Sequence, residues 1–351
     1  MLILGIETSC DDTAAAVIEA KGGFKKPTFS VLANTSYSQV AIHKKFGGIV
    51  PNLASRAHLQ KIFPTIKEAL RAAKTKIEDI DLIAITRGPG LMPSLLIGVN
   101  AARALAYRFR KPIIGVNHIE GHIYSNWLAN KKVEFPTLVL TVSGGHTELV
   151  LIKDYGKYKV IGRTLDDAAG EAFDKAARLL DLGFPGGPLI AAEAAKCPTL
   201  RVATRRVEIK LPRPMINSKD FNFSFSGLKT AVLYLYNDLI KKYPPEEIKP
   251  AFAAEVQNAI VDVLVSKTIK AVEKFNPKTI MVSGGVSANK KLREIMAEKV
   301  APFGIPLLIP DFAYTTDNAA MIAVAGYFNY LKKKPAADAW KKLEANANLE
   351  L

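Results

Sequence analysis

Two stretches with the same plan decide the fold. Residues 2–19 read LILGIETSCDDTAAAVIE, and residues 137–152 read TLVLTVSGGHTELVLI. In each, an apolar run leads into a short polar turn and then a second run rich in apolar residues, which predicts two strands joined as a hairpin. Backbone N–H groups in such turns can face a phosphate, although an ordinary hairpin is the simpler interpretation. The repeat of the plan predicts a duplicated lobe.

Strands and helices alternate after the first hairpin, which predicts a largely parallel sheet with an antiparallel hairpin at one edge. Apolar positions at helical spacing predict a helix over 53–74, and glycine turns precede several others. The second half repeats this alternation. The further expected strands are 30–37, 81–86, 112–116, 279–283 and 305–309. The further expected helices are 94–108, 118–128, 166–182, 189–196, 228–242, 246–275, 290–300 and 319–331.

The chain has 351 residues, which exceeds the usual size of one domain and favours two lobes. Its composition is that of an ordinary globular protein, but Lys and Arg outnumber Asp and Glu by 48 to 33. The resulting net charge of +15 favours a polyanionic partner, nucleic acid first and a membrane surface second.

Two cysteines, Cys10 and Cys197, are too few for a disulfide framework or a four-cysteine zinc site and indicate a reducing compartment. No leader-like stretch begins the sequence, and no apolar run is long enough to span a bilayer. These features predict a cytoplasmic protein with no membrane partner.

A histidine pair is the most specific local feature. His118 and His122 stand four residues apart at the end of the strand expected over 112–116, so a helix would place both imidazoles on one face. This is the spacing of metal ligands, although a pair of structural histidines is the commoner meaning of such a spacing. Glu120 stands two places after the first histidine, which argues against the H-E-x-x-H pattern of metalloproteases.

Other local features leave alternatives open. Gly284-Gly285 follows another apolar strand and suits close approach of a nucleotide. Asp317 or Asn318 is expected to cap the start of the last long helix, and local sequence favours Asp317. The segment between Lys196 and Lys229 is basic, and Phe221, Phe223 and Phe225 stand near its end. These phenylalanines suit either the buried face of a strand or, less favoured, base stacking beside phosphate contacts.

Taken in order, these motifs resemble the tRNA N6-adenosine threonylcarbamoyltransferase family, bacterial branch, formerly described as O-sialoglycoprotein endopeptidases. The resemblance runs from Leu2 to about Tyr330. It is carried by residues 5–11 (GIETSCD), 47–55, 88–91 (GPGL), 118–122 (HIEGH), 142–147, 166–175, 223–229, 284–289 (GGVSAN) and 316–318 (TDN). It implies an α/β fold of two ribonuclease-H-like lobes of the actin-like ATPase superfold around a central cleft.

The resemblance also implies the lobe boundaries: residues 1–136 as the N-terminal lobe, with about 320–351 packing back on it, and 137–319 as the C-terminal lobe with the nucleotide and substrate site. One divalent metal, Fe(II) or Zn(II), is implied at His118, His122 and Asp317. Asp11 is the implied acidic residue for activity. The implied substrate-binding residues are Thr141, Val142, Ser143, Gly144, Gly145, Asp174, Gly187 and Asn289.

The implied reaction transfers the threonylcarbamoyl group from threonylcarbamoyl-AMP to N6 of adenosine 37 in tRNAs that read codons beginning with A. The implied partners are tRNA, a paralogous scaffold subunit, a small P-loop ATPase and a separate enzyme that makes the adenylate. Asp12 stands where bacterial members of the family commonly have glutamate. Ala57, Met92 and Pro93 also differ from the residues that are usual in the family at those positions. A sugar-kinase-like phosphotransferase of the same superfold is the alternative function.

Overall fold

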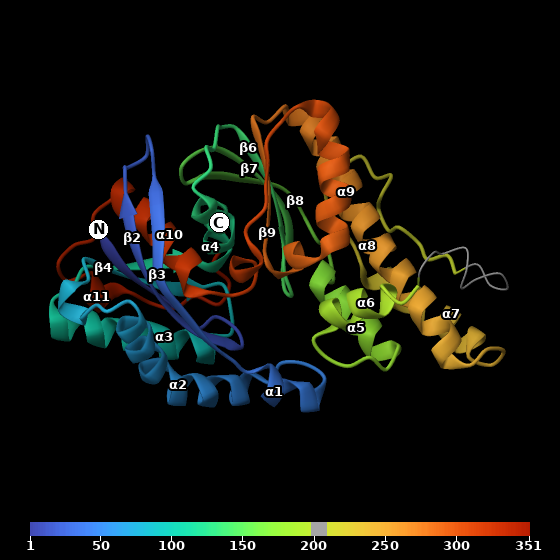
Figure 1. Cartoon of the computed structure of the whole chain (residues 1–351), viewed down its shortest axis with the longest axis horizontal. Coiled ribbons are helices and arrows are strands. Elements are labelled where there is room, and N and C mark those ends of the chain that lie inside the picture. Colours follow the sequence, from blue (N-terminus) through green and yellow to red (C-terminus); the bar gives the residue numbers. More distant parts are fainter. Residues whose placement is uncertain (198–208) are drawn as a thin grey trace. The chain divides into compact units, whose positions relative to one another are not determined.

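The computed structural model describes residues 1–197 and 209–351, which form two compact units (Figure 1). The first unit comprises Met1–Glu134, Ile152–Tyr158 and Pro310–Leu351; the second comprises Phe135–Leu151 and Lys159–Ile309. The predicted phosphate-binding segment lies partly outside the described residues, and Arg201, Arg205 and Arg206 are among those left out.

The first unit contains a five-stranded sheet in the order β3-β2-β1-β4-β5. β1 pairs antiparallel with β2 and parallel with β4, and Gly5 faces Ala16 on one side and Ala84 on the other. β2 and β3 are antiparallel, whereas β4 and β5 are parallel. The parallel sheet with an antiparallel edge is therefore confirmed. The strands are β1 (Leu2–Glu7), β2 (Asp12–Lys21), β3 (Thr28–Ser38), β4 (Leu82–Gly88) and β5 (Ile113–Asn117).

The second sheet has the order β10-β9-β6-β7-β8, which repeats the first with β6 in the place of β1. β6 is parallel to β9, as β1 is to β4, so the predicted duplication is confirmed. The sequence did not predict β8, because its alternating Lys, Tyr and Val side chains give a weak apolar pattern. The strands are β6 (Thr137–Val142), β7 (Thr147–Asp154), β8 (Lys157–Arg163), β9 (Thr279–Ser283) and β10 (Leu307–Leu308).

Helices cover both faces of the first sheet. Leu4 and Ile6 share a core with α2 and α3, whereas Gly5, which points to the opposite face of the strand, lies against α10. The expected helix over 118–128 ends as an α-helix at Tyr124 and continues as a 3-10 turn. The helices are α1 (Val40–His43), α2 (Pro51–Ala72), α3 (Met92–Phe109), α4 (His118–Tyr124), α10 (Ala319–Lys332) and α11 (Ala339–Lys342).

Small residues let α10 approach the sheet closely. A Cβ added at Gly5 would lie 2.1 Å from the carbonyl oxygen of Ala319, and one added at Gly326 would lie 2.4 Å from the Cβ of Ala84. Both distances are shorter than any real carbon contact, so only glycine fits at either position. The start of α10 is thereby held against β1, at the end of the helix next to Asp317.

The second unit is built around α8, a long helix whose buried residues run from Ile248 to Val272. Phe223 and Phe225 are fully buried in its core, and Phe221 is nearly so, so the buried interpretation of these phenylalanines is correct and base stacking on them is excluded. The helices are α5 (Ala169–Leu179), α6 (Gly186–Ala194), α7 (Ser226–Leu239), α8 (Pro245–Phe275) and α9 (Lys290–Val300). Short 3-10 turns occupy Lys44–Phe46, Ile77–Asp79, Ser125–Ala129, Gly285–Ala288, Ala301–Phe303 and Phe312–Tyr314.

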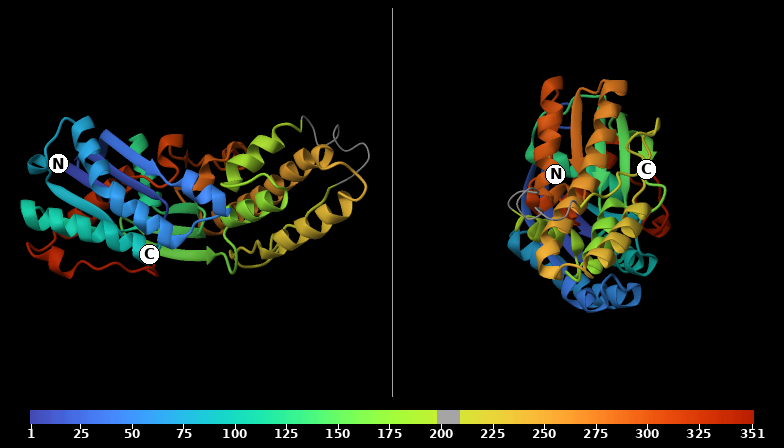
Figure 2. Two further views of the ribbon diagram at one scale, coloured as in Figure 1. Left: turned by 90° about the horizontal axis from the view of Figure 1, so that it is seen from below. Right: turned by 90° about the vertical axis from the view of Figure 1, so that its right-hand side faces the viewer.

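The segment after α10 returns along the first unit, with α11 beside α3 (Figure 2). Arg103 Nε donates to the carbonyl of Trp340 at 2.7 Å, and the backbone N–H of Asn346 donates to the carbonyl of Arg87 at 2.7 Å. Asn117 Nδ2 then donates to the carbonyl of Glu350 at 3.1 Å. The C-terminal segment therefore packs against the residue that precedes α4.

Replacing Gly5 by alanine should destabilise the first unit by about 1–3 kcal/mol, because the new methyl group must displace the backbone of α10. Urea unfolding followed by circular dichroism measures the loss. The matched control is Gly227→Ala in α7, where an added Cβ meets nothing within 4 Å and stability should be unchanged or slightly higher. Wild-type stability of Gly5→Ala would contradict the close packing of α10 on β1.

Candidate metal centre

α4 places His118 and His122 on one helical face, and both are buried. The helix begins directly after β5, where the side-chain oxygen of Asn117 accepts hydrogen bonds from the N–H groups of Ile119 and Glu120. Gly121 lies against α10, since an added Cβ would come within 2.7 Å of Ile322 Cδ1. The cap and the glycine together set where the histidines stand relative to α10.

Asp317 comes from the turn that leads into α10. Local sequence favours Asp317 as the N-cap of that helix, but this prediction is wrong: the cap is Asn318, whose Oδ1 accepts from the N–H of Met321 at 3.0 Å. Asn318 Nδ2 also donates to the carbonyl of Thr316 at 2.8 Å, which tightens the turn. Asp317 is thereby left to face the histidines.

The three side chains converge. Asp317 Oδ1 lies 3.5 Å from His118 Nε2 and 3.3 Å from His122 Nε2, and one ligand atom from each residue falls within 4.8 Å of the others. Both ring nitrogens of His122 are buried and form no hydrogen bond with the described residues, although Nε2 lies 3.3 Å from Asp317 Oδ1. Such orphaned nitrogens are costly unless an ion fills the space. Two imidazoles and one carboxylate fit a divalent metal ion.

Glu7, at the end of β1, lies behind His118. Its Oε2 is 3.0 Å from His118 Nδ1. Burial raises the pKa of Glu7, but the interaction with His118 lowers it by more, so the pKa of Glu7 lies below its usual value. Burial likewise lowers the pKa of His118, but the carboxylates of Asp317 and Glu7 outweigh it and raise that pKa to about 9. Burial lowers the pKa of His122. The carboxylates of Glu7 and Asp317 thus place negative charge beside the histidines, which favours binding of a cation.

The turn after β1 contributes two further carboxylates, Asp11 and Asp12. His58 fixes this turn, with Nε2 3.0 Å from the carbonyl of Cys10 and Nδ1 2.8 Å from Thr13 Oγ1. Asp12 Oδ1 is buried without a hydrogen-bond partner, and burial, followed by the charges of Asp317 and Asp11, raises the pKa of Asp12 to about 7.

Sequence reasoning named Asp11 but gave no role to Asp12 or Glu7. The adjacent acids of the turn were a signal for Asp12, since like charges side by side shift pKa values. No local signal marks Glu7, because a glutamate at the end of a strand is ordinary and its contact with His118 is long-range. Glu120 is not available to a metalloprotease-like mechanism, because it accepts hydrogen bonds from Tyr158 Oη at 2.6 Å and from Asn329 Nδ2 at 2.8 Å.

The residues predicted to bind substrate all lie in the second unit. Gly144, Gly145 and Gly187 have nothing within 4 Å of an added Cβ, so another molecule can approach their backbone closely. Ser143 closes the β6–β7 turn, since its N–H donates to the carbonyl of His146. Val142 ends β6 and is buried.

Three of the predicted substrate-binding side chains have partners within the unit. Thr141 Oγ1 is 3.1 Å from Ser283 Oγ, which joins the ends of β6 and β9. Asp174 Oδ1 accepts from the N–H of Gly186 at 2.6 Å, at the start of α6. Asn289 caps α9 by accepting from Leu292 and donates through Nδ2 to Gln257 Oε1. These contacts hold the loops that follow β6, β9 and α5.

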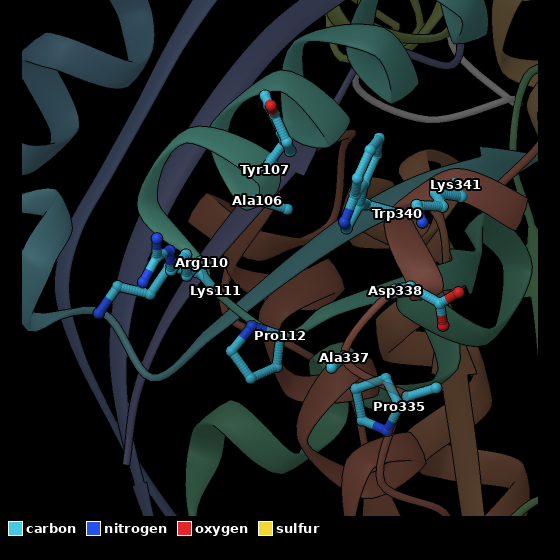
Figure 3. A pocket seen from close by; sticks show the side chains of 11 residues that line it. Ala106, Tyr107, Arg110, Lys111, Pro112, Pro335, Ala337, Asp338, Trp340 and Lys341 are labelled. Carbon is cyan, nitrogen blue, oxygen red and sulfur yellow. The ribbon is translucent and has the colours of Figure 1, made fainter.

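A cavity of about 460 Å³ also lies in the first unit, between the end of α3 and the segment around α11 (Figure 3). The rings of Tyr107 and Trp340 in its wall are 4.8 Å apart, and Arg110, Asp338 and Lys341 supply charge. None of the predicted site residues lines it. Among the described helices, none has the length and apolar character needed to cross a membrane.

The fold is that of the actin-like ATPase superfamily, with two lobes. Solved structures that share it include the activator of 2-hydroxyisocaproyl-CoA dehydratase from Clostridium difficile, with a TM-score of 0.51 at 11% identity over 99% of this chain and 100% of that one. Full-length HypF aligns with a TM-score of 0.56 at 13% identity, over 99% of this chain and 47% of that one. The fold and the cluster of two histidines and an aspartate together define a two-lobed α/β protein with a candidate metal centre.

The sequence identifies the family. The profile of TsaD, tRNA N6-adenosine threonylcarbamoyltransferase, matches residues 30–324. Proteins of that name from Caldicellulosiruptor saccharolyticus and Bacillus subtilis are both 48% identical over 95% of this chain, covering 94% and 91% of their own lengths. The one from Thermosipho africanus is 46% identical over the full length of both chains. The chain belongs to the tRNA N6-adenosine threonylcarbamoyltransferase family, and the sugar-kinase alternative is not favoured.

The raised pKa of Asp12 makes stability depend on pH. Because the folded state holds the Asp12 proton more tightly than the unfolded state does, ionising Asp12 costs folding free energy, and stability falls as pH rises from about 4 to about 7 and then stays level. Asp12→Asn should therefore stabilise the chelator-treated protein at pH 8 by about 2–4 kcal/mol, at about 1.4 kcal/mol per pKa unit. At pH 4 the gain should vanish.

Urea unfolding at the two pH values measures this difference. Asp338→Asn, on the surface, is the matched control and should shift stability equally at both. Addition of Zn²⁺ should reduce the gain at pH 8, since a nearby cation favours the charged form of Asp12. An Asp12→Asn effect that is the same at pH 4 and pH 8 would contradict the raised pKa.

Proposed function

We propose that the chain transfers the threonylcarbamoyl group of threonylcarbamoyl-AMP to N6 of adenosine 37 in tRNAs that read codons beginning with A, and that the reaction is assisted by one divalent metal ion. The observation that supports the metal is the convergence of His118, His122 and Asp317, with buried nitrogens on His122 that lack any other partner. The ion is Fe(II) or Zn(II), since either suits two imidazoles and one carboxylate.

His118 and His122 hold the ion through their Nε2 atoms, and Asp317 holds it through its carboxylate. When bound, such an ion polarises a carbonyl or holds the carboxylate and hydroxyl of the threonyl group. Because the three ligands come from α4 and from the turn before α10, which pack on each other, the protein keeps their geometry without help from a flexible loop.

The donor is already activated, so the protein mainly has to orient it and stabilise charge. In the transfer, N6 attacks the carbamoyl carbon, the bond from that carbon to the phosphate oxygen breaks, and AMP leaves with the electron pair. We assign the acceptance of the N6 proton to the turn after β1, with Asp11 as the residue that the family motif indicates. Asp12 is a second candidate, because its pKa of about 7 suits a general base near neutral pH.

The loops of the second unit bind the donor in this proposal. Thr141, Val142, Ser143, Gly144 and Gly145 line the threonylcarbamoyl group, and the absence of side chains at Gly144 and Gly145 allows close backbone contact. The nucleoside portion is held by Asp174, Gly187 and Asn289. Open space at Gly187, beside the start of α6, supports this placement.

A tRNA substrate explains the net charge of +15, since phosphate contacts dominate affinity for nucleic acid. A paralogous scaffold subunit and a small P-loop ATPase are proposed partners, and a separate enzyme supplies threonylcarbamoyl-AMP. These assignments rest on the family resemblance alone, as does the cytoplasmic location where tRNA is modified.

Purified protein should label an unmodified tRNA with threonylcarbamoyl-AMP carrying labelled threonine, alone or with the partner subunits added. His118→Ala and Asp317→Ala should each reduce labelling at least about 100-fold, and a chelator should reduce it equally, because each change removes the ion or one of its ligands. His43→Ala is the matched control: this buried histidine contacts Gln39, outside the cluster, and should leave the metal content unchanged.

Labelling that persists in both variants and in chelator would exclude the metal-assisted mechanism. A tRNA in which adenosine 37 is replaced by guanosine tests the acceptor, and it should take no label. Labelling of that tRNA would place the reaction at another nucleotide.

A further inference from the structure

Glu7 lies at the end of β1 and is fully buried, yet no step of the proposed reaction uses it. Burial of a carboxylate is costly unless both of its oxygens are paired, and here they are. Oε1 accepts the N–H of Ser9, while Oε2 accepts the hydroxyl of Thr86 at 2.6 Å and faces His118 Nδ1 at 3.0 Å. The central strand and its parallel neighbour β4 therefore hold Glu7 rigidly against one metal-binding histidine.

The contact determines which ring nitrogen of His118 is free. A neutral imidazole carries its proton on one nitrogen and a lone pair on the other. With Nδ1 against Glu7, and Ser9 Oγ also 3.1 Å away, the proton is held on Nδ1. When an ion takes the place of the second ring proton, Nε2 presents its lone pair on the side where Asp317 Oδ1 lies, 3.5 Å away. A carboxylate that accepts the far N–H of a ligating histidine also makes that ligand more basic.

The second histidine lacks this support. His122 Nδ1 is buried and has no hydrogen-bond partner among the described residues. The cluster is therefore asymmetric: His118 is fixed through its far nitrogen, whereas the far nitrogen of His122 has no such contact among the described residues. Loss of the Glu7 carboxylate would leave Ser9 Oγ as the remaining contact of His118 Nδ1.

We propose that Glu7 is the positioning residue of the metal centre, which fixes the tautomer and ring orientation of His118 and so sets the affinity for the ion. The inference rests on the proposed metal site, but not on the transferase reaction. Another buried carboxylate, Glu120 on α4, offers a comparison, because its hydrogen bonds come from Tyr158 and Asn329 and not from a histidine.

Glu7→Gln keeps the shape of the side chain and removes its charge. Its affinity for Zn²⁺, measured by competition with a chromophoric chelator, should fall about 10–100-fold. With Co²⁺ as the probe, the visible absorption bands should shift or weaken, because the ligand field at His118 changes. Glu120→Gln should keep wild-type Zn²⁺ affinity and an unchanged Co²⁺ spectrum.

Wild-type affinity and spectrum in Glu7→Gln would overturn the proposal, and so would equal losses of affinity in Glu7→Gln and Glu120→Gln. If Glu7→Gln does not fold, Thr86→Val is the variant to test, because it removes only the hydroxyl that orients Glu7. Thr86→Val should also lower the affinity for Zn²⁺, and an unchanged affinity would overturn the proposal. Zn²⁺ that binds the wild-type protein no more tightly than His118→Ala would instead refute the metal site itself.

Discussion

The close packing of α10 on the first sheet is the constraint on which the candidate metal centre depends. Gly5 and Gly326 let the helix backbone approach β1 and β4, and Gly121 lets α4 approach α10. Because Asp317 directly precedes the first turn of α10 and the histidines stand on α4, their meeting is a consequence of helix and sheet packing. The site needs no loop to close around it.

Electrostatics reinforce this arrangement. Glu7, Asp12 and Asp317 bring negative charge into a buried region, and burial, followed by repulsion from the other carboxylates, raises the pKa of Asp12. Without a cation, His118 offsets part of this charge by holding a proton, as its pKa of about 9 indicates. A divalent ion would replace that proton and satisfy His122 as well, so the region is better matched to a metal than to a purely structural cluster.

The equivalent turns of the duplicated topology carry different kinds of residue. After β1, the turn carries Asp11 and Asp12 and lies near the histidine cluster. After β6, the equivalent turn carries Gly144 and Gly145, whose backbone is open to approach. One hairpin thus presents carboxylates, while its counterpart presents bare backbone.

The sequence by itself determined the α/β class, the paired hairpins and the approximate bounds of the long helices, because hydrophobic period and glycine turns are local signals. The H-x-x-x-H spacing was compatible with a metal site, and the resemblance to the family implied Asp317 as its third ligand. Only the tertiary structure decided that Asn318, and not Asp317, caps α10, that Phe223 and Phe225 are core residues, and that Glu7 stands behind His118. The last two of these facts depend on contacts between residues far apart in sequence, 111 positions for Glu7 and His118, and no local pattern encodes such contacts.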